Sequence, residues 1–91
     1  MKDFIWDNKK NQWLKEKRHC TFEDVLINIE KGNIIKVLEH PNQGIYPGQK
    51  IILININNYV YCVPFWENND TVYLITLYAS RKYTKQYLGV E

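Results

Sequence analysis

Cysteine is scarce in this chain, and its spacing excludes two kinds of site. Cys20 and Cys62 are the only cysteines, they lie far apart, and no Cys-x-x-Cys pattern is present. A structural zinc site needs more ligands at tighter spacing, and a dithiol redox centre needs neighbouring cysteines. We therefore expect two reduced thiols, buried or without a role.

Long apolar runs and common catalytic signatures are also missing. No stretch approaches the roughly 20 apolar residues of a membrane-spanning helix, and the opening MKDFIWDNKK contains no run of signal-peptide length. We therefore expect a cytoplasmic protein. A glycine-rich phosphate loop, Gly-x-Ser-x-Gly and His-Glu-x-x-His are all absent, which excludes the most familiar nucleotide-binding, hydrolase and zinc-protease motifs.

Net charge is small, but its distribution is uneven. The chain carries +2, which does not by itself indicate nucleic-acid binding. Five basic residues lie in 9–18 and three in 81–85, whereas none of the residues from Ile51 to Trp66 is charged. A basic surface therefore forms only if folding brings the two basic segments together.

Length and composition predict one domain over residues 1–91. Ninety-one residues with 45% hydrophobic content are enough for a single core without disulfides or metal. Residues 6–18 read as a first helix with Asp7 as N-cap. Residues 21–32 read as a second, with Thr21 and Asp24 forming a capping box and Gly32 ending it.

The remainder reads as a sheet followed by a helix. Strands are expected at 33–39, 50–56, 59–66 and 71–78, separated by a long loop at 40–49, a tight Asn57–Asn58 turn and a turn at 67–70. Pro64 lacks an N–H, so its strand should be bulged or unpaired nearby. Ser80 should cap a last helix that Gly89 ends. The predicted fold is α+β: two N-terminal helices, about four antiparallel strands and a short C-terminal helix.

Arg81 is the first candidate functional residue. It should occupy the first position of the last helix, where free N–H groups and a guanidinium together suit a phosphate. The alternative is a solvated or salt-bridged surface arginine.

His19 and His40 are candidates for proton transfer. Metal-independent RNA cleavage needs a base for the 2′-hydroxyl, a cation for the charged phosphorane and an acid for the leaving oxygen. Histidine suits the first and last of these tasks. Both could equally be ordinary, partly exposed loop residues. Tyr59 and Tyr61 share one strand face, where they could stack bases or simply pack.

Two segments resemble the BrnT family of type II toxins. FIWDNKKNQWLKEKRHCTFEDV (4–25) is similar to the family's opening, and YLITLYASRKYTKQYL (73–88) to its ending. The matching residues are Phe4, Trp6, Asp7, Lys9 or Lys10, Thr21, Phe22, Glu23, Asp24, Arg81, Lys82 and Thr84. Aligned from Thr21, His19 falls where the family has glycine and Arg18 where it has histidine.

The resemblance implies a RelE-like, metal-independent ribonuclease that cuts RNA and arrests growth. It implies no cofactor, and it implies a ribbon-helix-helix antitoxin as partner in a hetero-oligomeric complex. The resemblance carries over Arg81 and Lys82 as phosphate-binding positions. On the ribonuclease interpretation, the catalytic residues are Arg81, which stabilises the scissile phosphate, and His19 or His40, which moves the protons. The phosphate-binding residues would be Lys82, Lys9, Lys10, Arg18 and Lys85, on the expectation that both basic segments meet across the sheet. The alternatives are a non-catalytic RNA- or protein-binding module with the same basic face, and a small structural or interaction protein.

Overall fold

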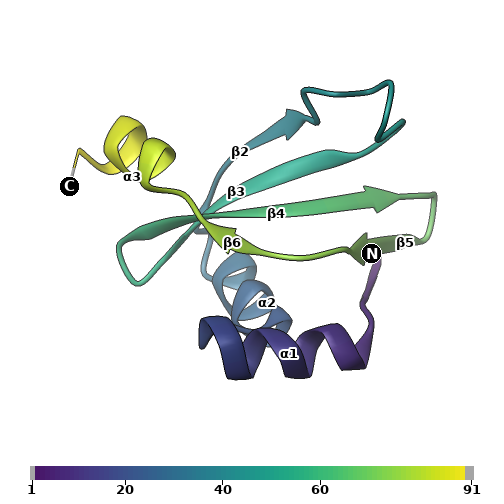
Figure 1. The fold of residues 1–91 in the computed structure, drawn as a ribbon, viewed down its shortest axis with the longest axis horizontal. Coiled ribbons are helices and arrows are strands. Elements are labelled where there is room, and N and C mark those ends of the chain that lie inside the picture. Colours follow the sequence, from purple (N-terminus) through teal and green to yellow (C-terminus); the bar gives the residue numbers. More distant parts are fainter. Residues whose placement is uncertain (1, 90–91) are drawn as a thin grey trace.

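The computed structural model describes residues 2–89, which fold into three helices and a six-stranded sheet (Figure 1). In chain order the elements are β1 (Asp3–Ile5), α1 (Asn8–Arg18), α2 (Phe22–Glu30), β2 (Ile34–Glu39), β3 (Lys50–Ile56), β4 (Tyr59–Glu67), β5 (Thr71–Leu74), β6 (Tyr78–Ala79) and α3 (Arg81–Leu88). The predicted α+β class is confirmed, as are the two N-terminal helices and the short last helix. Among residues 2–89, no helix has the length and apolar character needed to cross a membrane.

The helix ends follow the predicted local chemistry. The Asp7 carboxylate accepts hydrogen bonds from the backbone N–H groups of Lys9 and Lys10. Thr21 and Asp24 form the complete capping box. Ser80 Oγ accepts from the N–H of Tyr83, and Gly89 ends α3 with a φ of 67°. These caps satisfy free N–H groups of the first turns and so fix where each helix begins.

The sheet differs from the prediction in strand number and direction. Its order is β1-β5-β4-β3-β2, with β6 pairing to β4, and β1 runs parallel to β5. The expected sheet of about four antiparallel strands is therefore wrong. The missed strand, β1, has only three residues, too few to show an alternating pattern.

The single strand predicted over 71–78 is divided into β5 and β6, and the break lies opposite Pro64 of β4. The pairing of β4 with β3 is continuous through Pro64, which lies opposite Ile51 with no shift in register. On the opposite side of β4, the carbonyl of Pro64 accepts a hydrogen bond from the N–H of Ile75. The N–H and carbonyl of a residue in an antiparallel strand point to the same side, so the N–H that proline lacks would also face the β5–β6 segment. There β4 pairs with β5 at Phe65–Glu67 and with β6 at Tyr61–Cys62, with no regular pairing between. The predicted irregularity at Pro64 thus lies on the β5–β6 side alone.

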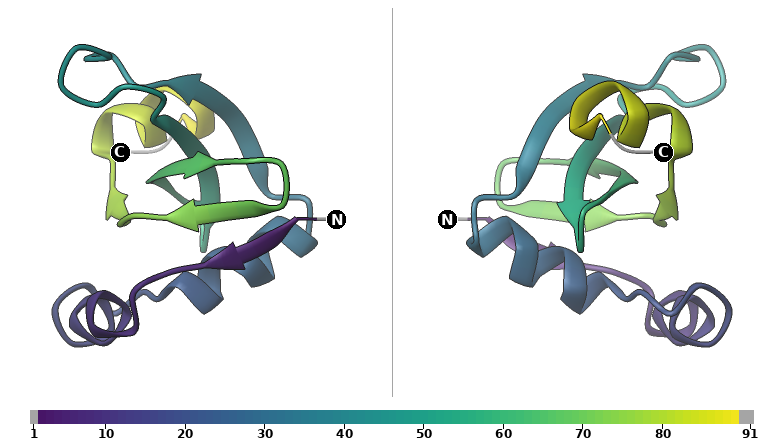
Figure 2. Two further views of the ribbon diagram at one scale, coloured as in Figure 1. Left: turned by 90° about the vertical axis from the view of Figure 1, so that its right-hand side faces the viewer. Right: turned by 90° about the vertical axis from the view of Figure 1, so that its left-hand side faces the viewer.

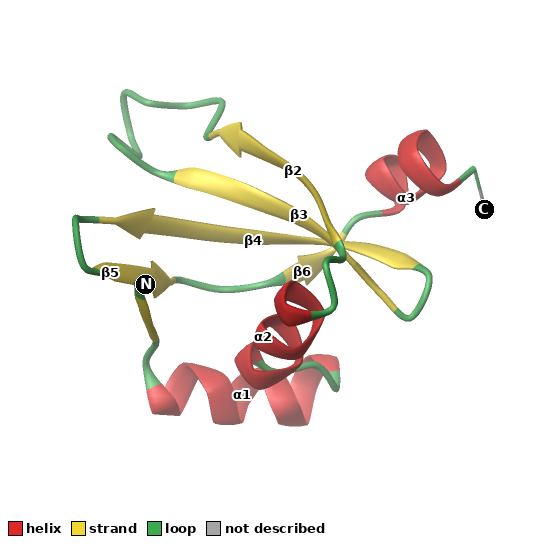
Figure 3. Ribbon diagram, turned by 180° about the vertical axis from the view of Figure 1, so that it is seen from behind, coloured by secondary structure: helices red, strands yellow, loops and turns green. Residues whose placement is uncertain are grey.

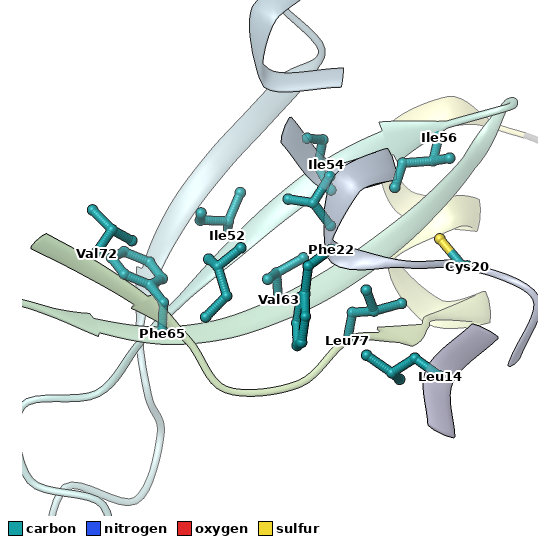
Figure 4. Packing of buried hydrophobic residues seen from close by; sticks show 12 residues of the cluster. Leu14, Cys20, Phe22, Ile52, Ile54, Ile56, Val63, Phe65, Val72 and Leu77 are labelled. Atoms are coloured by element: carbon teal, nitrogen blue, oxygen red, sulfur yellow. The ribbon is translucent and has the colours of Figure 1, made fainter. Parts of the chain in front are cut away.

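Helices cover both faces of the sheet. Ile52, Ile54 and Ile56 of β3 belong to the cluster that includes Leu14 and Phe22 from α1 and α2 (Figure 4). The alternate residues Ile51 and Leu53 pack instead with Tyr83, Tyr87 and Leu88 of α3. Figure 2 shows the result, with α1 and α2 on one side of the sheet and α3 on the other.

This two-sided packing corrects the expectation of one shared basic patch. The basic segment 9–18 lies in α1 and the segment 81–85 lies in α3, and the sheet separates them (Figure 2). The physical reason is the period of two along β3, whose successive side chains point to opposite faces. The end of α1 reaches the segment just before β6 through the Arg18 side chain, as described next.

Candidate functional site

Four segments lie at the same end of the molecule, which we call the hairpin end. It comprises the end of α1 (Arg18, His19), the β3–β4 turn (Asn57, Asn58), β6, and the start of α3 (Arg81, Lys82), grouped at the left of Figure 1 and at the right of Figure 3. The guanidinium of Arg18 donates to the carbonyl of Leu77, just before β6. The N–H of Ser80 bonds to the carbonyl of Val60, at 2.9 Å. These bonds tie α1 and α3 to the same sheet edge from opposite faces.

Arg81 is the first residue of α3, and its side chain is exposed. Within residues 2–89 its guanidinium has no hydrogen bond, ion pair or aromatic contact. Ser80 caps the N–H of Tyr83 and not those of Arg81 or Lys82, which point out of the helix start. A free guanidinium beside free N–H groups at a positive helix end is suited to a phosphate. The sequence left open whether Arg81 binds phosphate or is a solvated or salt-bridged surface residue. Within residues 2–89 no salt bridge to Arg81 is present, so the salt-bridged alternative does not apply.

Thr84 fixes α3 against the sheet. It is 1% exposed, its hydroxyl donates to the carbonyl of Ser80 at 2.7 Å, and it accepts from the N–H of Val60 at 2.9 Å. The threonine that matches the toxin-like ending is thus a structural residue that positions Arg81 one turn earlier.

Replacing Thr84 with valine is expected to destabilise the protein by about 1–3 kcal/mol, because the buried N–H of Val60 would lose its acceptor while the shape of the side chain is kept. Urea unfolding measures the change. Thr76→Val is a matched control, since the buried hydroxyl of Thr76 has no partner within residues 2–89 and its removal should leave stability equal or higher. Equal stability losses in both variants would contradict the anchoring role of Thr84.

The end of α1 places Arg18 and His19 at the hairpin end. Besides its bond to Leu77, the Arg18 guanidinium lies 4.8 Å from the centre of the Trp13 ring. Arg18 therefore holds α1 to the β5–β6 segment, and its predicted phosphate contact would have to use its remaining donors. His19 has a left-handed backbone, with a φ of 55°. Glycine adopts this conformation most easily, and histidine is among the other residues that are enriched in it.

His40 lies far from Arg81. The N–H of His40 bonds to the carbonyl of Gln49, immediately before β3. The hairpin end begins after Ile56, so the length of β3, roughly 20 Å, separates the two places. His40 packs against Tyr46, with ring centres 4.4 Å apart, and its Nδ1 accepts from the N–H of Asn42. The structure brings His19, and not His40, to the end that holds Arg81.

Of the remaining lysines predicted to bind phosphate, two lie away from the hairpin end and two lie on α3. Lys9 and Lys10 lie in the first turn of α1, about 15 Å along the helix from His19, and Lys10 lies 4.2 Å from the centre of the Trp13 ring. They are not part of the hairpin end. Lys82 is exposed there, beside Arg81, and Lys85 is exposed one turn further along α3.

The two cysteines lie on opposite faces of the sheet and are free and buried. Burial raises the pKa of the Cys20 thiol to about 11, and the nearby Asp24 carboxylate contributes to the increase. Burial also raises the pKa of Cys62. Both thiols are therefore protonated near neutral pH, which argues against a nucleophilic role. In the part of the chain from 2 to 89, no group of three or more histidine, cysteine or acidic residues is arranged to hold a metal.

Two aromatic pairs flank the sheet, one predicted and one missed. Tyr59 and Tyr61 share the face covered by α1 and α2, with ring centres 6.2 Å apart. Both are half-buried, and burial raises the pKa of Tyr61. At the other end of β4, Trp66 stacks on Tyr73 at 5.3 Å and is 48% exposed. Sequence reasoning missed this second pair because it depends on the β4–β5 register.

Comparisons with known proteins give no relative for this chain. No protein-family model matches it, and neither the curated proteins nor the solved structures contain a significant match. The resemblance to BrnT toxins therefore depends on the residues quoted for it.

Proposed function

We propose that this protein is a metal-independent endoribonuclease that acts as the toxin of a type II toxin–antitoxin pair. The observation that carries the proposal is Arg81: an exposed guanidinium without a partner in the described structure, at the start of a helix that Thr84 anchors. Arg81 belongs to the segment that resembles the end of BrnT toxins. The left-handed backbone at His19, where the family has glycine, is a second physical agreement with that alignment.

The chemistry follows from the placement of the charged groups. The Arg81 guanidinium binds the scissile phosphate and stabilises the extra negative charge of the phosphorane. His19, at the same end of the molecule, takes the proton of the attacking 2′-hydroxyl. The 2′-oxygen bonds to phosphorus, and the bond between phosphorus and the 5′-oxygen breaks. The 5′-oxygen takes a proton from water, His19 returns its proton to solvent, and the products are a 2′,3′-cyclic phosphate and a 5′-hydroxyl. Lys82 and Lys85 hold the neighbouring backbone.

A ribbon-helix-helix antitoxin is the partner expected on this proposal. It would neutralise the toxin by covering the hairpin end, and its contacting segment should be acidic or apolar to complement the cations there. Reading the DNA beside the gene tests this directly: an adjacent open reading frame with a ribbon-helix-helix pattern supports the pairing.

The proposal is tested by incubating the purified chain with RNA in the presence of excess chelator. We expect cleavage to persist and the products to carry 2′,3′-cyclic phosphate ends. RNA that binds but stays intact would favour the alternative of a non-catalytic RNA-binding module. RNA that neither binds nor is cut would exclude both.

A further inference from the structure

A second feature of the hairpin end is a cavity of about 330 Å³ between α2 and the β3–β4 hairpin. The side chains that matter here are His19, Asp24, Asn28, Lys31, Asn57 and Tyr61. They come from the end of α1, both ends of α2, the turn and β4, so the fold gathers them from four separate segments. We call this space the hairpin cavity.

The hairpin cavity presents unused hydrogen-bond donors. In the described structure, the side chains of His19, Lys31, Asn57 and Tyr61 make no hydrogen bond or ion pair. Asp24, in contrast, is occupied, because its carboxylate accepts from the N–H and hydroxyl of Thr21 at 2.9 and 3.1 Å. An ammonium, an imidazole, an amide and a phenol that share one cavity suit a ligand with anionic and carbonyl oxygens.

Backbone conformation helps to place two of these residues on the cavity. His19 and Asn57 both have left-handed backbones, with φ of 55° and 54°, and both line the cavity. The tight turn explains Asn57, which tolerates this conformation well. Histidine is also enriched in this conformation, and at the end of α1 it places residue 19 on the cavity.

The cavity lies close to Arg81 along the β6 edge. Tyr61 pairs with Ala79, two residues before Arg81. One interstrand step and two residues of chain place the Cα atoms of Tyr61 and Arg81 about 10–12 Å apart. Tyr61 belongs to the face covered by α1 and α2, and Arg81 begins the helix on the other face, so a nucleotide that spans both sites passes around the β6 edge.

We propose that the hairpin cavity binds the nucleoside on the 5′ side of the cut, the one that carries the attacking 2′-hydroxyl. Its base lies against the Tyr61 ring with an edge on the Asn57 amide, and Lys31 binds its 5′-phosphate. The cavity thereby selects the base at which RNA is cut. This inference rests on the proposed ribonuclease function for its substrate, but the binding can be measured separately.

The test uses the four nucleoside 3′,5′-bisphosphates as probes, because they carry both the phosphate assigned to Arg81 and the one assigned to Lys31, and NMR chemical shifts of the labelled protein are the readout. We expect shifts around His19, Asn28, Lys31, Asn57 and Tyr61 for at least one nucleotide. Asn57→Gly, which keeps the turn and removes the amide, and Lys31→Gln should each weaken binding about 10-fold. Asn58→Gly is the matched control, because Asn58 has the same left-handed backbone in the same turn but does not line the cavity.

Three results separate this inference from the proposed function. Shifts confined to Arg81 and its neighbours, or equal affinities for Asn57→Gly and Asn58→Gly, would overturn the cavity as a nucleoside site. Cleavage of RNA alongside that result would leave the ribonuclease intact. Nucleotide binding in the cavity without any RNA cleavage would support the site while removing the proposed function.

Discussion

Replacing Arg81 with alanine should lower RNA cleavage by about 100-fold or more and restore growth to cells that express the protein. A single preorganised group that stabilises developing charge is commonly worth this much. Folding should be unaffected, because the Arg81 side chain is exposed and has no partner in residues 2–89. Cleavage rate, growth after induction and the urea midpoint measure the three expectations together.

The control is Lys36→Ala, which removes an exposed cation from β2, away from the hairpin end. It should leave cleavage and growth arrest unchanged. Arg81→Lys keeps the charge but loses the planar pair of donors, so its activity should fall between those of the wild type and Arg81→Ala. Undiminished cleavage by Arg81→Ala would remove this residue from the mechanism, and with it the main support for the proposed function.

Replacing His19 with glycine should raise stability and lower activity in the same protein. Glycine adopts the left-handed conformation of residue 19 readily, so we expect a gain of about 0.5–1 kcal/mol in the free energy of unfolding. Loss of the imidazole should lower cleavage by about 100-fold or more, as is usual for a general base. Urea unfolding and the rate of RNA cleavage measure the two opposite changes.

His19→Asn separates the backbone effect from the loss of the imidazole. Asparagine tolerates a positive φ but cannot carry the proton, so this variant should be near wild type in stability and as inactive as His19→Gly. Full activity in both variants would move proton transfer to another group. A stability loss in His19→Gly would instead mean that the imidazole serves packing.

Local signals predicted the helices well. Asp7, Thr21 with Asp24, and Ser80 each cap a helix as expected, since capping depends only on the next few residues. The Asn57–Asn58 turn was predicted for the same reason, and both residues have positive φ. Arg81 could be placed at a helix start without knowing the fold.

Long-range features were harder to predict. Pairing of β1 with β5 depends on three residues at each strand, and no local pattern marks it. The separation of α1 from α3, however, had a signal in the sequence. The run IILINI in β3 is apolar at nearly every position, which is typical of a strand covered on both faces. That run favours helices on both faces. The position of His40, at the opposite end of β3 from Arg81, could likewise be recognised only once the fold was known.

The parallel pairing of β1 with β5 has a consequence for the order of folding. Its partners, such as Phe4 and Val72, are separated by most of the chain, whereas β3 and β4 are joined by two residues. Closing a long loop is entropically unfavourable until other contacts exist, so the central hairpin should form early and β1 should join last. Until then, the side of β5 that β1 occupies is an open edge, and this is where a partly folded chain is most exposed to pairing with another copy.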